Sequence, residues 1–107
     1  MKPRSYYCDT WAMQYYFLVG WNYKKIEKFL NNIYKIKIDL SKDDGFCIEI
    51  NGDIYIWTRH KHNYPVIAHE CTHAATMTLN MRGWQMDYNN DEPLAYLIQT
   101  IMEKILR

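Results

Sequence analysis

Two histidines in the second half of the chain are spaced so that both can bind one metal ion. Residues 69–73 read His-Glu-Cys-Thr-His, which places His69 and His73 four positions apart. On an α-helix, side chains at positions i and i+4 lie one turn apart on the same face, so two imidazoles there can share an ion. Glu70, next to the first histidine, can reach a water that the ion activates. The motif therefore predicts metal-assisted hydrolysis, with Zn²⁺ as the cofactor that such ligands suit.

A catalytic zinc ion usually has three protein ligands, so a third must lie further along the chain. The residues just after His73 contain neither the glycine nor the third histidine of the metzincin signature, so that zinc-binding pattern is excluded. Glu92 opens the next expected helix, and the loop before it is long enough to fold that helix back antiparallel to the first. We therefore predict Glu92 as the third ligand. If Glu92 only caps its helix, Asp87 or Asp91 would take this place.

Residues 63–106 resemble the gluzincins, in which two motif histidines and a glutamate from the following helix hold zinc. The resemblance rests on the pairing of His69-Glu70-Cys71-Thr72-His73 with Asp91-Glu92-Pro93-Leu94-Ala95-Tyr96. Within that class the chain is similar to small HExxH proteins encoded by tailed bacteriophages. This resemblance implies a minimal zincin-like fold and a zinc-dependent metallopeptidase, with His69, His73 and Glu92 as ligands and Glu70 as general base. Gluzincins often have an aspartate four residues after the ligand glutamate, where this chain has Tyr96.

Hydrolysis of an amide also needs a donor for the negative charge that develops on the carbonyl oxygen. Tyr96 lies one helical turn beyond Glu92, and His62 comes shortly before the motif helix, so we consider both as catalytic residues. The other candidates for this role are His60, Tyr64 and Tyr88. An extended peptide substrate would pair with residues 53–57 if that strand forms the edge of the sheet, which is how zincins generally hold substrates.

Three other interpretations of the motif compete with a metallopeptidase. In the first, the histidines pack and hydrogen-bond without any metal. In the second, the zincin fold is a catalytically inactive binding protein, such as a phage-encoded inhibitor or modulator of a host factor, because so small a domain has little wall for specificity pockets. In the third, zinc is purely structural and protein ligands fill all four of its positions. Cys71 points away from the metal face of the helix and is expected to be a small core residue.

Apolar patterns predict the strands and the first helix. The β-favouring run 14–19 and the alternation over 36–40 each predict a strand. Between them, residues 22–34 carry apolar side chains at helical spacing. The dipeptide Asn51-Gly52 predicts a tight hairpin, because it accepts the positive φ values of a type I′ turn. The hairpin strands are residues 46–50 and 53–57.

Capping residues bound the two helices of the C-terminal half. Asn63 and Pro65 are typical of a helix start, and Gly83 is typical of its end. A last helix is expected from Glu92 or Pro93 to Leu106. The resulting order β-α-β-β-β-α-α predicts a single α+β domain over residues 1–107. In it, a small, mostly antiparallel sheet packs against the motif helix and the C-terminal helix.

Composition bounds the remaining function classes. A chain of 107 residues favours one domain, and a net charge of +1 gives no argument for a nucleic-acid or membrane partner. The expected partners are a peptide or protein substrate, or a host protein. Three cysteines without a close pair and no long apolar run favour a cytoplasmic protein, in the host cell if a phage encodes it. The basic run over residues 59–62 either steers an acidic substrate or a nucleic acid, or is simply solvated, which is the commoner case for such a loop.

Overall fold

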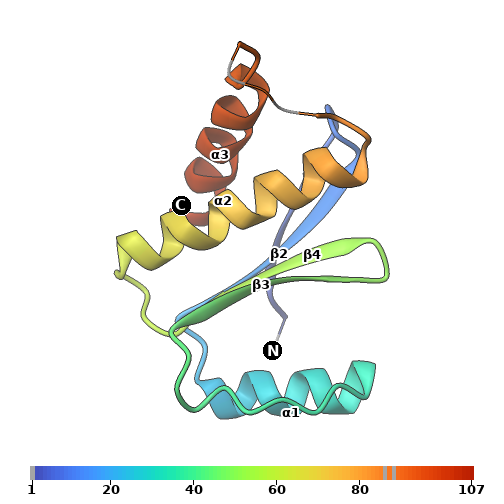
Figure 1. Cartoon of the computed structure of the whole chain (residues 1–107). Helices are drawn as coiled ribbons and strands as arrows, with labels where there is room; N and C mark the ends of the chain where they lie inside the picture. Colours follow the sequence, from blue (N-terminus) through green and yellow to red (C-terminus); the bar gives the residue numbers. More distant parts are fainter. Residues whose placement is uncertain (1, 86, 88) are drawn as a thin grey trace.

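The computed structural model describes residues 2–85, 87 and 89–107. In this part of the chain, four strands form one mixed sheet and three helices pack on it (Figure 1). The small α+β domain expected from the sequence is thereby confirmed. The strands are β1 (Arg4–Cys8), β2 (Met13–Val19), β3 (Gly45–Ile50) and β4 (Asp53–Thr58). The helices are α1 (Tyr23–Tyr34), α2 (Tyr64–Met81) and α3 (Glu92–Ile105).

The sheet has the strand order β1-β2-β4-β3. Strands β1 and β2 pair antiparallel, as do β3 and β4, whereas β2 and β4 pair parallel through the crossover that contains α1. The predicted hairpin is present, and its turn residues Asn51 and Gly52 have φ values of 54° and 90°. Strand β4 is central, because it pairs with both β2 and β3. The edge strand on this side of the sheet is therefore β3, and not residues 53–57.

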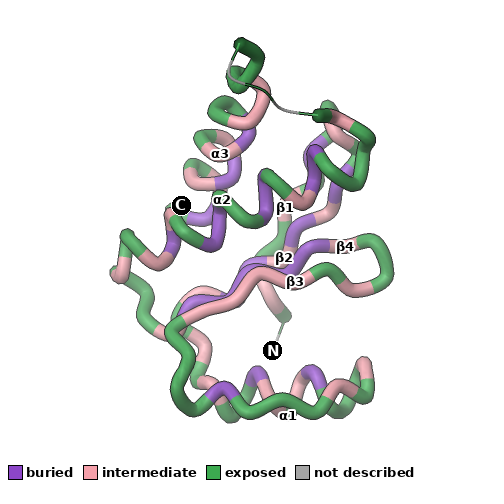
Figure 2. The backbone as a smooth tube through the Cα atoms, in the orientation of Figure 1, coloured by how far each residue is buried: buried purple, intermediate pink, exposed green. Residues whose placement is uncertain are grey.

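Helices cover both faces of the sheet. Alternate residues of β4 point to opposite faces, so Ile54 and Ile56 pack in the core under α2 and α3, whereas Tyr55 and Trp57 pack in the core under α1. The buried residues of α1, Ile26 and Leu30, belong to this second core, and the buried positions of α1 lie on the side of the helix that faces the sheet (Figure 2). No helix in the described residues has the length and apolar character needed to cross a membrane.

The strand predicted over residues 36–40 is wrong. Lys35 ends α1 in the left-handed conformation with φ 59°, and the amide of Ile36 donates to the carbonyl of Leu30, which turns the chain back beside the helix. The amide of Leu40 donates to the Glu27 carboxylate at 2.8 Å, and the Leu40 side chain is buried. This segment thus lies beside α1 without a strand partner, and its alternating apolar residues differ in burial, since Leu40 is buried and Ile38 is exposed.

The predicted order of elements is also wrong, because the first strand lies earlier in the chain. Strand β1 pairs with β2 over residues that show no clear alternation, with Arg4 opposite Phe17 and Cys8 opposite Met13. The observed order is β-β-α-β-β-α-α. The motif helix and the last helix still follow the hairpin, so the elements that carry the candidate site are the expected ones.

Candidate metal centre

Helix α2 places the motif in its middle turns and is capped as its sequence predicts. The Asn63 side chain accepts a hydrogen bond from the amide of Val66, and Pro65 occupies the first turn. At the other end, Gly83 has a φ of 77° and terminates the helix. Cys71 lies fully buried in the core, as expected for the residue that points away from the motif's histidines.

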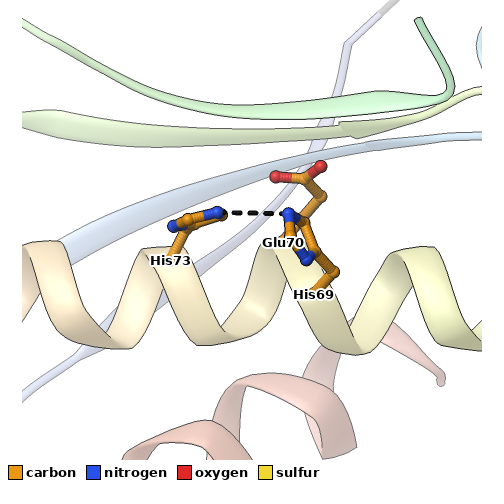
Figure 3. Close-up of side chains that lie close together, drawn as sticks. All are labelled: His69, Glu70 and His73. Carbon is orange, nitrogen blue, oxygen red and sulfur yellow. Dashed lines mark hydrogen bonds between the residues drawn. The ribbon is translucent and has the colours of Figure 1, made fainter.

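The two motif histidines come together on one face of α2. Their Nε2 atoms are 3.2 Å apart, and their ring centroids are 4.7 Å apart with the planes nearly perpendicular. Figure 3 shows both rings on the side of the helix that faces the strands. Both side chains are exposed, so solvent and small ions reach them. In a hydrogen bond at this distance one Nε2–H donates to the other Nε2, whereas a shared metal ion needs the lone pairs of both unprotonated nitrogens.

Glu70 extends from the same turn of α2 into the space beneath β3. Its side chain is only 7% exposed, and a carboxylate oxygen lies 3.3 Å from the point where a Cβ on Gly45 would be. Burial raises the pKa of the Glu70 carboxyl, and the neighbouring His69 and His73 oppose that rise. A carboxyl held in this way is closer to the pKa that suits a general base near neutral pH than an exposed one is.

The ligand atoms of His69, Glu70 and His73 all lie within 4.8 Å of one another. Among the described residues, these three form the group that could hold a metal ion. Two nitrogens bound to one tetrahedral zinc at its usual bond lengths are roughly 3.4 Å apart, close to the observed 3.2 Å. Two imidazoles and a carboxylate are also donors that first-row divalent ions accept. The residues present therefore fit such an ion.

The two cysteines nearest this group are poor candidates for metal ligands. Burial raises the pKa of the Cys47 thiol and of the Cys71 thiol to about 12, and the charge of Glu70 acts in the same direction. A thiol ligates a metal as the thiolate, which is disfavoured at both positions. The Cys47 sulfur lies 3.5 Å from the sulfur of Met77, which is a packing contact between β3 and α2.

The predicted third ligand, Glu92, does not join the histidines in this structure. It is the first residue of α3 and is exposed. Figure 3 shows the motif side chains pointing from α2 toward the strands, and α3 lies on the other side of α2 (Figure 1). The alternatives Asp87 and Asp91 are exposed as well and are not in the group. A ligand role for Glu92 stays a prediction that requires the first turn of α3 to change position.

The described candidates for the oxyanion donor lie on α3, in the loop before α2 and at the first residue of α2. Tyr96 is 65% exposed on α3 and lines a cavity that it shares with residues of β1. His62 lies before α2, with its Nδ1 atom 3.3 Å from the hydroxyl of Tyr64. His60 is exposed in the same loop, and Tyr88 lies outside the described residues. A catalytic role for any of them stays a prediction.

Gly45 is the contribution to the site that sequence reasoning missed. A Cβ at this position would lie 2.7 Å from the Trp57 carbonyl oxygen, 3.1 Å from a Val66 methyl group and 3.3 Å from Glu70. The absence of a side chain at position 45 is therefore what lets the Glu70 carboxylate sit against β3. A glycine in the first position of an alternating strand was the available signal.

Comparison with known proteins finds no match for this chain. No protein-family model, no curated protein and no solved structure matches the chain. Support for a function therefore comes from the motif and from the arrangement of its side chains.

Proposed function

We propose that this chain is a metal-dependent hydrolase of peptide bonds, in which His69 and His73 hold a divalent ion, Zn²⁺ in the first place. The observation that carries the proposal is the 3.2 Å separation of the two Nε2 atoms, which matches two ligands of one tetrahedral ion. The exposure of both rings supports it further, because a catalytic ion keeps a position open to water and substrate.

Glu70 is the proposed general base. When bound, a divalent ion polarises the scissile carbonyl and lowers the pKa of water. The Glu70 carboxylate accepts a proton from the attacking water as the oxygen bonds to the carbonyl carbon. The same carboxyl returns the proton to the nitrogen of the leaving amine as the carbon–nitrogen bond breaks. Its low exposure and raised pKa suit both halves of this transfer.

An extended peptide is the substrate class that the sheet favours. Strand β3 pairs only with β4 in the described chain, so the backbone groups along its other edge have no strand partner. A peptide that adds to this edge by strand pairing would run past Gly45, which lies in contact range of Glu70. The corrected edge strand thus brings the proposed substrate path closer to the base than residues 53–57 would.

Replacing Glu70 with Gln tests this function directly. The amide keeps the shape of the side chain but cannot accept the proton, so kcat/KM for casein or a peptide library should fall by about 10²–10⁴-fold. Zn²⁺ binding should persist at the wild-type stoichiometry. Glu103→Gln, at an exposed position of α3, is the matched control and should retain full activity. Undiminished cleavage by the Glu70→Gln protein would refute the proposed mechanism.

A catalytically inactive binding protein is the second candidate, and the position of Glu92 favours it. With Glu70 acting as the base and Glu92 exposed apart from the histidines, the ion has two protein ligands, fewer than catalytic zinc sites normally have. On this alternative the chain is an inhibitor or modulator of a host protein. Wild-type protein would then cleave no peptide in the library, and its effect in cells would survive Glu70→Gln.

A further inference from the structure

A second candidate site lies at the end of the sheet where β2 leaves it and α2 begins. It is a cavity of about 220 Å³ that shares no lining residue with the histidine group. Its polar lining comes from four separate segments of the chain: the start of β1, the loop before α2, the first residue of α2 and the end of the described chain. These side chains are Arg4, Lys61, His62, Tyr64 and Arg107.

The charged side chains that line this cavity are all positive. Three of its polar side chains are permanent cations, and no acidic side chain lines it in the described part of the chain. Like charges that line one cavity repel one another, and an anion bound between them would relieve that repulsion. The cavity is therefore electrostatically prepared for an anionic ligand.

Arg4 is held in place before any ligand arrives. Its Nη1 atom donates to the carbonyl of Ile105 at 3.1 Å, and its Nη2 atom donates to the carbonyl of Lys104 at 2.6 Å. The guanidinium carbon lies 5.8 Å from the centre of the Phe17 ring. Two hydrogen bonds leave other N–H groups of the guanidinium for a ligand. A fixed arginine loses little conformational entropy when it binds an anion.

The loop that supplies Lys61 and His62 is also fixed against the sheet. A Cβ on Gly20 would lie 3.5 Å from the Cβ of Lys61, so the loop lies in close contact with the end of β2. The amide of Gly20 donates to the Thr58 carbonyl at 2.8 Å, which ties this end of β2 to the start of the loop. These contacts with Gly20 determine the position at which Lys61 lines the cavity.

We propose that this cavity binds the phosphate group of a small molecule. Arginine and lysine are the side chains that proteins use most for phosphate, arginine through its planar fork and lysine as a point charge. The volume is below the roughly 300 Å³ at which pockets for drug-sized ligands begin, so the ligand is a phosphate ion or a small phosphomonoester. The wider groove along α1 is a poorer candidate, because Glu27 stands among its lysines.

Titration followed by NMR tests this proposal on the full chain. Amide shifts are recorded while inorganic phosphate, and in a second arm glycerol 3-phosphate, replaces chloride at constant ionic strength of about 0.1 M. The proposal predicts saturable shifts at Val19, Lys61, His62 and Leu106. Tighter binding of one of the two probes identifies whether the site takes free phosphate or a phosphomonoester, and either order supports it.

Two variants distinguish a specific phosphate site from a general attraction of phosphate to surface lysines and arginines. Lys61→Ala should raise the Kd for the better probe by about fivefold or more. Lys28→Ala, an equally exposed lysine in the α1 groove, is the matched control and should change it less than about twofold. Shifts that do not saturate, or that are equal in the Lys61→Ala protein, would overturn the proposal. So would shifts centred on α1.

Discussion

The two helices that carry the candidate ligands hold their side chains in different ways. In the middle of α2, the histidine rings already lie one turn apart, and Glu70 is 7% exposed beneath β3. At the start of α3, Glu92 is exposed, and the preceding Asp91 makes no side-chain capping hydrogen bond. One half of the proposed site is therefore preorganised by a helix that packs on the sheet, and the other half depends on an exposed helix end.

This difference shows which part of a metal site the geometry of a single helix can determine. The spacing of His69 and His73 follows from the pitch of α2, and packing against β3 fixes the Glu70 carboxylate. A ligand from α3 requires that helix to lie at a particular distance from the histidines of α2. No local sequence pattern determines that distance. The following changes test each side of the comparison.

The largest effect is expected on the buried side, from Gly45→Ala. The added Cβ would meet the Trp57 carbonyl oxygen at 2.7 Å, and backbone cannot yield as a flexible side chain can. We expect a loss of about 2 kcal/mol in the free energy of unfolding, measured with urea. Gly83→Ala is the control, because a Cβ there meets nothing and only its φ of 77° is unfavourable. It should cost about 1 kcal/mol, and a larger loss there than at Gly45 would contradict the close packing described for β3.

A smaller effect, of opposite sign, is expected from Glu70→Gln in metal-free protein. Burial raises the pKa of Glu70 in the folded state, so keeping the carboxylate ionised costs folding stability. That cost is absent below the ordinary pKa of glutamic acid and develops as the pH rises through it. The variant should have a higher Tm than wild type at neutral pH, and the gain should vanish near pH 4. A lower Tm at neutral pH would show that the ionised carboxylate stabilises this fold.

The smallest effect is expected on the exposed side, from Glu92→Gln. Because Glu92 lies outside the ligand group, the Kd for Zn²⁺ should change by less than about threefold, or roughly 0.6 kcal/mol. Calorimetry on both proteins measures it. A loss of tenfold or more would instead show that the first turn of α3 moves onto the ion, and that the ligand predicted from the sequence is the real one.

Local patterns predicted most of the fold, and long-range pairings account for what was missed. The hairpin turn at Asn51-Gly52 and the cap at Asn63 each depend on neighbouring residues, and both are present. Strand β1 exists because it pairs with β2, and residues 36–40 are not a strand because they pack on α1. The same limit applies to the site: a helix repeat brings His69 and His73 together, whereas nothing in the sequence fixes where Glu92 lies.

Direct titration of Zn²⁺ into metal-free protein tests the central claim, that the two histidines of α2 share one ion. We predict one ion per chain for wild type and for His60→Ala, which removes an exposed histidine outside the group. His69→Ala and His73→Ala should each weaken binding by about a hundredfold or more, because each removes one of the few ligands. Equal affinity in all four proteins, or no saturable binding in wild type, would contradict the account.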